Sequence, residues 1–463
     1  MWLRSPWCNT NKNLIRLFEK VKKHHPDFNS PKLTKEKLFK QILPNGKFSD
    51  RRMNNLLSEG YQAAERFIIF QNLNCDENLQ KELLVKEFQN RHLEDWFFKE
   101  SDKEIEKLES KEVKEWEDLL QLFRMHRRVY HHPNQSLRMK PANHTLEKMN
   151  EPIDQFYLLE KAAIINEKIF RNRLIKGENH DITLDLKRWL ELSINNSSPP
   201  IKIYRMRFNY TEENFLNHYH SIRNFFLENF EKLNHFDKKV NFFSLVNDTS
   251  KLIRARVFDI TEHLPLYKLG LRTEIIFNEG TLTYFTYAMI VAASNTKKDF
   301  TFTANFIETY SDKLESNLQE DGLNWAKAHT KYYQENLNDC LVLLLNHDFK
   351  SHYFQQITKM LTTQVYFDLY LKDHSFQSYL FNYFDSFEKW LLRENFRSQL
   401  KKKSFLRFVQ VSRTLAKSIT EVNFNENKIE DLLQNESNIQ ASEWLNRKIK
   451  IILKLKRKRL PNT

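Results

Sequence analysis

The chain has 463 residues, of which 29% are charged and 13% aromatic, whereas it contains six glycines and eleven prolines. The glycines lie far apart, so the sequence lacks the glycine-rich loops that P-loop and Rossmann nucleotide sites require. So few turn-forming residues also disfavour sandwiches and barrels, which need a turn every ~8–12 residues. We therefore expect an all-α protein with long helices.

The charge balance is basic, with 73 Lys and Arg against 60 Asp and Glu, a net charge of +13. Such a surplus attracts anionic partners, but the two signs alternate along most of the chain, as on solvated helix faces. The three cysteines are widely separated, which disfavours a disulfide framework and a four-ligand zinc site. No signal peptide or transmembrane segment is evident, so we expect a cytoplasmic protein. Because no nucleotide or metal motif is found, we expect no cofactor.

Helical periodicity begins near the N-terminus and predicts a first helix that ends before Pro26. Ser30 and Pro31 predict the start of a second helix, because a hydroxyl caps the end and proline suits the first helical position. A third helix is expected from about Ser49. The inward residues predicted for the first two helices are Leu14, Leu17, Phe18, Val21, Leu38, Phe39 and Ile42.

The charge-rich stretch that follows is predicted to continue as long helices to about residue 130. From Ser49 to residue 130 the predicted core residues are Met53, Leu56, Leu57, Ala64, Phe67, Ile68, Leu83, Leu84, Phe88, Trp96 and Phe97. A loop is expected from His131 to Asn150, and Pro152 is expected to open the next helix. The apolar face of that helix is predicted to contain Ile153, Phe156, Tyr157 and Ile164.

The segment 195–200 reads Asn-Asn-Ser-Ser-Pro-Pro and is the strongest helix-breaking cluster in the chain. We therefore predict an N-terminal helical subdomain over 1–194 and a linking helical region over 195–279. Thr211 is expected to begin a helix of that region. Its predicted apolar face contains Phe215, Tyr219, Ile222, Phe226, Phe230 and Leu233.

From residue 280 to 446 a unit of helix, short turn and helix recurs. Its turns are followed by Phe300, Leu337 and Phe376, spaced 37 and 39 residues apart. The positions three, four and seven residues further along are Thr303, Ala304 and Ile307 in the first unit. They are Cys340, Leu341 and Leu344 in the second unit, and Tyr379, Leu380 and Tyr383 in the third. A hairpin of this kind cannot bury both faces alone, so successive hairpins are expected to stack into an elongated array.

The third unit, 370–380, resembles the centre of a tetratricopeptide repeat, with aromatic residues on both sides of a polar turn. It departs from that family at His374, where glycine is usual, and at Tyr379, where a small residue is usual. The resemblance covers about residues 280–420 and implies stacked antiparallel helical hairpins, a tetratricopeptide-like α-solenoid. As a whole the sequence also resembles uncharacterised bacterial helical proteins with an aromatic-rich repeat end, which implies no particular activity.

Tetratricopeptide proteins typically bind peptides in their groove, so the resemblance implies a non-enzymatic scaffold or adaptor that binds another protein. Contacts are expected from the inner helices of the array. The candidate protein-binding residues are Tyr332, Gln334, Tyr366 and Asp368.

The basic C-terminal end, 447–463, leaves a second interpretation open. On a helix its apolar residues could close the end of the array while its lysines point outward. The residues expected to face inward are Trp444, Leu445, Ile449, Ile452 and Leu453. Alternatively, the basic residues could neutralise phosphates in a nucleic-acid-associated accessory protein. The candidates for that function are Arg124, Arg127, Arg128, Arg138, Lys140, Lys454, Lys456, Arg457, Lys458 and Arg459.

Catalytic and metal-binding patterns are weak. The histidines at 126, 131, 132 and 144 lie among arginines that would repel a cation, and the sequence has no HExxH pattern. Asp181, Asp185 and Lys187 have an acidic-site spacing that arises easily by chance in so charged a chain. We find no nucleophile elbow, although a site assembled from distant helices would leave no such signature.

Overall fold

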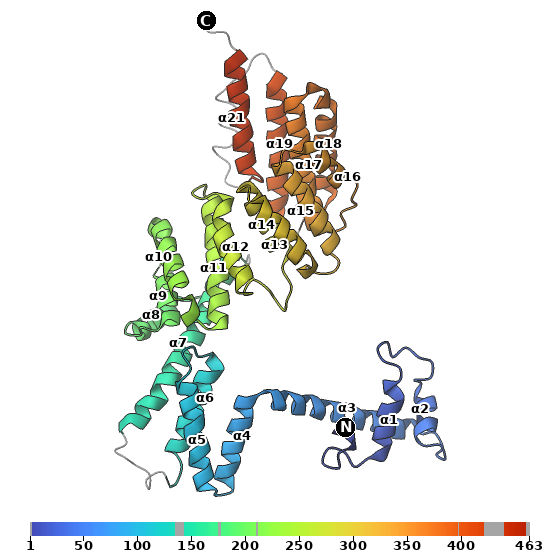
Figure 1. Cartoon of the computed structure of the whole chain (residues 1–463), viewed down its shortest axis with the longest axis vertical. Coiled ribbons are helices and arrows are strands. Elements are labelled where there is room, and N and C mark those ends of the chain that lie inside the picture. The colour runs from blue at the N-terminus through green and yellow to red at the C-terminus, as the bar shows by residue number, and fades with distance from the viewer. Residues whose placement is uncertain are drawn as a thin grey trace. The chain divides into compact units, whose positions relative to one another are not determined.

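The computed structural model describes residues 2–134, 143–174, 177–209, 212–396, 398–420 and 439–459 (Figure 1). Within these ranges the regular elements are helices, with an isolated bridge between Asn278 and Thr281. None of the described helices has the length and apolar composition needed to cross a bilayer. The chain divides into two compact units, Met1–Ile194 and Asn195–Thr463, and the division falls in the Asn-Asn-Ser-Ser-Pro-Pro segment.

The first unit is formed by nine described helices, some of them short. They are η1 (Trp2–Arg4), α1 (Lys12–Lys22), α2 (Lys35–Ile42), α3 (Asp50–Cys75), α4 (Glu77–Asn90), α5 (Glu94–Glu109), α6 (Trp116–Tyr130), α7 (Asn143–Leu174) and α8 (Thr183–Ser193). Helix α3 begins next to Ser49, as predicted, and the Ser49 hydroxyl caps it by accepting from the backbone N–H of Arg52. The predicted start of α2 is wrong, because Ser30 forms a turn with Leu33 and the helix begins after Thr34.

Two hydrophobic clusters hold this unit together. The first joins α1, α2 and the N-terminal half of α3, and it contains Leu14, Leu17, Leu38, Phe39, Ile42, Met53, Leu56 and Ala63. The second joins α4, α5 and α6, and it contains Val85, Phe97, Phe98, Ile105, Leu108, Leu122 and Met125. The predicted inward faces of α1 and α2 are thus confirmed, since Phe18 and Val21 also pack against the first cluster.

The core predicted for the rest of α3 and for α4 is mostly wrong. Every residue from Glu65 to Asn72 is exposed, and so are Leu83, Leu84 and Trp96. Helical periodicity predicted the apolar residues among them as core, but they stay exposed, although the ring of Trp2 in η1 lies edge-on to that of Phe67 at 5.6 Å.

Helix α7 begins earlier than predicted, and Pro152 lies inside it. Proline costs a helix a hydrogen bond, but it is buried here and the helix packs against α6 and α8. Tertiary packing therefore outweighs the local preference. The residues that α7 buries are shifted along its surface relative to the prediction, and include Leu158, Leu159, Ala162 and Ile165.

The second unit begins with helices of the linking region and continues into successive hairpins. Its first helices are α9 (Pro199–Phe208), η3 (Glu212–Asn214), α10 (Phe215–Glu228), η4 (Phe230–Lys232), α11 (His235–Arg254), η5 (Ile260–His263) and α12 (Leu264–Arg272). Thr211 lies outside the described residues. The predicted stripe of α10 is confirmed, because Tyr219, Ile222, Phe226, Phe230 and Leu233 are buried and Phe215 is half-buried.

Three helix pairs then follow one another. They are α13 (Tyr284–Thr296) with α14 (Phe300–Tyr310) and η6 (Ser311–Lys313), α15 (Gln319–Tyr333) with α16 (Leu337–Leu345), and α17 (His352–Lys372) with η7 (His374–Phe376) and α18 (Gln377–Arg393). Helix α13 packs against α15 and α15 against α17, while α18 packs against α19 (Gln399–Thr420). In the third pair the buried residues are Leu380, Phe384, Phe387 and Leu391, whereas Tyr379 is 62% exposed.

Candidate functional site

The last described helix, α21 (Ser442–Arg459), packs along α19 in the second unit (Figure 1). It is amphipathic, with apolar residues on one face and basic residues on the other. The apolar residues predicted to face inward are all buried: Trp444, Leu445, Ile449, Ile452 and Leu453. That prediction is confirmed.

Trp444 is the aromatic contact of α21 with the rest of the unit. Its ring lies 5.2 Å from the ring centroid of Phe367 on α17 and 5.8 Å from that of Phe408 on α19. Its indole Nε1 donates a hydrogen bond of 2.8 Å to the hydroxyl of Tyr332 on α15. One side chain therefore ties α21 to three other helices.

Lys448 makes the polar contact one turn further along α21. Its ammonium forms an ion pair with Asp368 on α17, and the two side chains are only 12% and 14% exposed. Asp368 also accepts a 2.7 Å hydrogen bond from the Tyr332 hydroxyl. Burial and the neighbouring Asp368 raise the pKa of Tyr332 well above its usual value, so the phenol stays protonated.

We call Tyr332, Phe367, Asp368 and Phe408 the α21 seat. The seat supplies an apolar wall, a hydroxyl that both accepts and donates, and a mostly buried carboxylate. It thereby matches an indole and an ammonium that lie four residues apart on one helix face. This complementarity is chemical as well as steric, because each polar group of the set has a partner.

A neutral polar layer continues from the seat between α13 and α15. The Asn295 amide donates to Nδ1 of His329 at 3.0 Å and to the hydroxyl of Thr330 at 3.1 Å. Burial lowers the pKa of His329 to about 3, so its imidazole is neutral at physiological pH. Thr296 donates to the hydroxyl of Tyr333 in the same layer. These groups hold helices together, and none is arranged as an acid, base or nucleophile.

Two of the four predicted protein-binding residues come together in the seat. Tyr332 and Asp368 are hydrogen-bonded to each other and covered by α21. Gln334 is exposed at the end of α15, and Tyr366 packs near Tyr379 and Tyr383 of α18. The sequence did not predict that a helix of the same chain covers these two residues.

For Trp444 and Lys448 the sequence did not predict the contacts that they make in the site. Trp444 was expected only as an end cap, and lysines of this segment were expected to point outward. The available signals were the spacing of four residues between Trp444 and Lys448 and the carboxylate of Asp368, which lies eighty residues before Lys448. Only the tertiary structure brings these three positions together.

Of the predicted nucleic-acid residues of the first unit, the structure describes Arg124, Arg127 and Arg128. Arg124 and Arg128 both pair with Glu82, at 3.2 and 3.1 Å, whereas Arg127 is exposed. Arg138 and Lys140 lie outside the described residues.

The basic residues of α21 have mixed environments. Lys454 is exposed and Lys456 is half-buried, while the side chains of Arg457, Lys458 and Arg459 lie outside those that the structure describes. Lys450 is exposed on the same face as Lys454. Lys448 differs from the prediction, because its ammonium is turned inward to Asp368.

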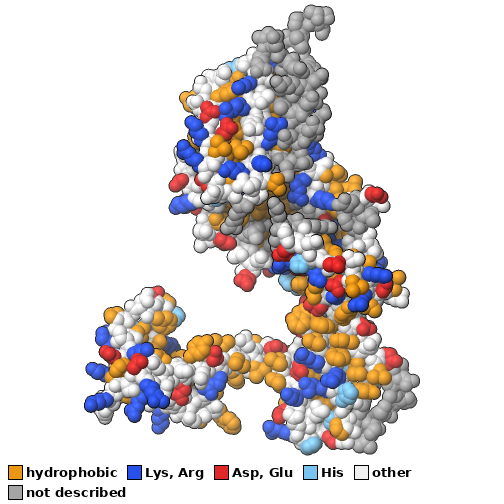
Figure 2. Space-filling view, turned by 180° about the vertical axis from the view of Figure 1, so that it is seen from behind, with side chains coloured by type: hydrophobic (Ala, Val, Ile, Leu, Met, Phe, Trp, Pro, Cys, Tyr) orange, Lys and Arg blue, Asp and Glu red, His pale blue; other side chains and the backbone are white. Residues whose placement is uncertain are grey.

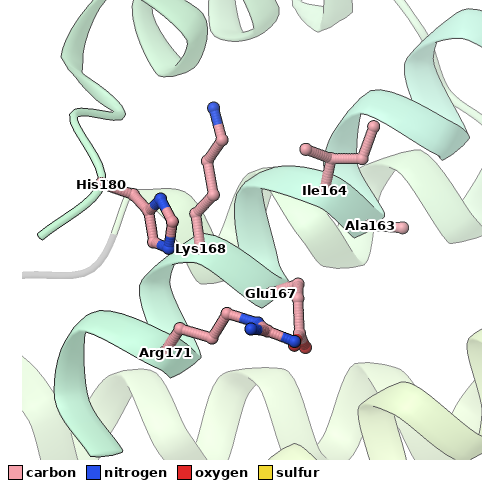
Figure 3. Close-up of a pocket in the computed structure, with 6 residues that line it drawn as sticks. All are labelled: Ala163, Ile164, Glu167, Lys168, Arg171 and His180. Carbon is pink, nitrogen blue, oxygen red and sulfur yellow. The ribbon is translucent and has the colours of Figure 1, made fainter. Parts of the chain in front are cut away.

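An open cleft of about 370 Å³ lies on α7 of the first unit (Figure 3). Arg171 and Glu167 of its lining pair with each other at 2.7 Å, while His180 and Lys168 contact Glu178 and Asp185 beside the cleft, at 3.0 and 2.9 Å. Arg171 lies 3.7 Å from Glu178 as well. The charged groups of the cleft thus form ion pairs within the first unit.

The acidic spacing at Asp181 and Asp185 is explained by local structure. Asp185 lies between Lys161 and Lys168, each at 2.9 Å, and their hydrogen bonds lower its pKa to about 2. Asp181 accepts from the backbone N–H of Thr183 at the start of α8. Among the described residues, no cluster of three His, Cys, Asp or Glu side chains is arranged to bind a metal ion.

The histidines near the basic loop also have packing contacts. His126 is 4% exposed and lies 3.5 Å from Glu109, and burial lowers its pKa. His132 stacks on the ring of Phe97 at 4.5 Å.

Comparison of the chain with protein-family models, with curated proteins and with solved structures gives no match.

Proposed function

We propose that this protein is a non-enzymatic protein-binding scaffold, in which α13 to α19 form a tetratricopeptide-like solenoid of stacked hairpins. The packing supports this proposal, because the first helices of successive pairs contact one another and each second helix contacts the next pair. Stacked hairpins of this kind offer an inner face that binds a segment of another protein.

The observation that carries the proposal is the α21 seat itself. The predicted partner-binding face holds an amphipathic helix through an aromatic anchor and a lysine one turn apart. This is the helix-in-groove mode of recognition, in which residues at i and i+4 provide the anchors. We infer that the partner's segment is a basic amphipathic helix with the same two anchors, and that it competes with α21.

A peptide-binding experiment tests this function on the full-length chain. Trp444→Ala combined with Lys448→Ala removes both anchors of α21 and leaves the seat intact. A fluorescent peptide of residues 439–459 should bind this variant, measured by anisotropy, and should bind the wild-type chain at least tenfold more weakly. Circular dichroism checks that the variant keeps its helices.

The matched control adds Asp368→Asn to the double variant. It should weaken peptide binding tenfold or more, because the carboxylate that receives the lysine is lost. Proteins captured from the source cells by the double variant should then be released by the unlabelled peptide. If the peptide binds neither chain, or if it releases no captured protein, the groove does not bind helices in trans.

A second candidate function rests on Lys450 and Lys454. They lie four residues apart on the exposed face of α21, which suits contact with successive phosphates of a nucleic acid. The Lys450→Glu, Lys454→Glu variant should then lose duplex or single-strand binding and show a smaller salt slope between about 50 and 200 mM. An unchanged affinity would remove α21 from this function, and the groove proposal would stand unaffected.

A further inference from the structure

The C-terminal half of α3 and the exposed side of α4 leave many large apolar side chains in solvent. Figure 2 shows hydrophobic side chains gathered along the stretch that α3 forms between the α1–α2 pair and α4. We call this set the α3–α4 apolar face. It consists of Tyr61, Phe67, Ile68, Ile69, Phe70, Leu79, Leu83 and Leu84.

This face is unlike the solvent side of an ordinary amphipathic helix. Phe67, Ile68, Ile69 and Phe70 follow one another directly, and their exposed fractions are 37%, 56%, 65% and 46%. Successive residues of a helix point about 100° apart, so these four side chains surround the helix axis. The helix is therefore apolar on every side at this point, which is typical of a helix that other helices cover.

The exposed area is large enough for a stable interface. With ~150–250 Å² for each fully exposed large side chain, the eight residues present roughly 700 Å² of apolar surface. The largest apolar patch of a typical monomer is about 300–600 Å², whereas a standard interface uses about 800 Å² on each partner. Summed over all sides of the helix, the exposed apolar area thus exceeds that of a typical single patch, and the part on one side contributes to a dimer interface.

The charge of the face identifies the kind of partner. Between Tyr61 and Cys75 the charged residues are Glu65 and Arg66, and between Leu79 and Leu84 they are Lys81 and Glu82, so each part of the face carries one charge of each sign. A neutral apolar surface provides no attraction to phosphate or to an acidic membrane. Homodimer interfaces are the class that is both this apolar and depleted in charge, because each copy brings the same surface to the contact.

We propose that the α3–α4 apolar face binds the same face of a second copy of this chain, in an isologous dimer related by a twofold axis. The α3 helices of the two copies pack against each other, and each covers the Phe67–Phe70 segment of the other. This inference is independent of the proposed function, since it concerns the other unit. The dimer would present two grooves, so a partner with two binding helices would gain avidity.

The test measures the mass of the full-length chain by light scattering after size exclusion, from about 1 to about 50 μM. The wild type is expected at twice the chain mass of 56.2 kDa at the upper concentrations. Ile68→Glu combined with Ile69→Glu should give 56.2 kDa throughout, with a dissociation constant raised at least a hundredfold. Glutamate is a good helix former, and both positions are exposed, so circular dichroism should not change.

The matched control is Leu192→Glu on α8, a residue with 60% exposure outside the face, and it should leave the dimer intact. A wild-type chain that stays at 56.2 kDa at about 50 μM overturns the proposal. A dimer that persists in the Ile68→Glu, Ile69→Glu variant also overturns the proposal. A monomeric wild type that binds neutral lipid vesicles through these residues would assign the face to a membrane surface instead.

Discussion

The α21 seat and the α3–α4 apolar face present the same physical problem with different outcomes. Both are helical surfaces with large aromatic and aliphatic side chains that water solvates poorly. In the second unit α21 covers the surface, and Trp444 is 4% exposed. In the first unit the corresponding side chains stay exposed, and Ile69 is 65% exposed.

The difference shows what an apolar pattern does and does not determine. The pattern specifies that a helix face needs a cover, because each large side chain left in water forgoes about 1.5–3 kcal/mol. It does not specify whether the cover comes from the same chain or another molecule. In the second unit a carboxylate and a hydroxyl add polar specificity to the cover, whereas the charges among the residues of the first unit's face balance one another.

The largest expected effect comes from Trp444→Ala in the covered region. The substitution removes a buried ring and the hydrogen bond to Tyr332, so we expect about 4 kcal/mol less stability of the second unit. Urea unfolding followed by circular dichroism measures it. Ile451→Ala, on the same helix but 41% exposed, should cost less than about 1 kcal/mol. Equal losses would mean that Trp444 does not anchor α21.

A somewhat smaller effect is expected for Asp368→Asn, which leaves the Lys448 ammonium mostly buried without its counter-charge. We expect about 3 kcal/mol of destabilisation. The double variant with Lys448→Met should recover a large part of this loss, since no unpaired charge then remains. Strictly additive losses in the double-mutant cycle would show that the two groups do not interact.

The next effect is a pH dependence caused by His329. Its pKa is about 3 in the folded chain, because the imidazole is buried, and 6.5 is its ordinary value. Between pH 3 and pH 6.5 the unfolded chain therefore binds a proton at this imidazole that the folded chain does not bind. The free energy of unfolding consequently falls as the pH drops below 6.5. From about pH 7 to about pH 5 the loss should be about 2 kcal/mol.

The control for this prediction is His329→Gln, whose side chain does not titrate. Urea unfolding of the variant should show a pH dependence smaller by that amount over the same range. His263, whose pKa burial lowers to about 4, contributes a similar slope in both chains and cancels in the difference. Identical slopes would place the His329 imidazole in a solvated environment.

The smallest effect on stability is expected from Ile68→Glu in the uncovered region. At concentrations where the copies are separate, the unfolding free energy should change by no more than about 0.5 kcal/mol. Thermal unfolding of dilute protein measures it. A loss of several kcal/mol would mean that Ile68 packs inside its own chain, and the comparison between the two regions would fail.

Much of the fold follows from local sequence signals. The apolar stripe of α10 and the Ser49 cap of α3 were predictable because they depend on residues within a few turns. The start of α2 and the position of Pro152 inside α7 were not. At these positions tertiary packing outweighs capping and proline preferences, which amount to about 1–3 kcal/mol.

The candidate site was predictable only in part. Tyr332 and Asp368 were recognisable as polar residues on inner helices, and Trp444 as a residue that faces inward. Their hydrogen-bonded arrangement depends on a contact across 112 positions of the chain between Tyr332 and Trp444. No local pattern encodes such a contact. The exposed run on α3 was missed for the converse reason, since periodicity cannot show that a covering element is missing.

The position of α21 in the chain order has a consequence for synthesis. The seat residues on α15, α17 and α19 are made before α21, which follows Thr420 after a further stretch of chain. At 5–20 residues per second, roughly 2 to 8 seconds of translation separate the completion of α19 from that of α21. A partner helix that reached the seat before α21 has docked would meet no competitor from the same chain.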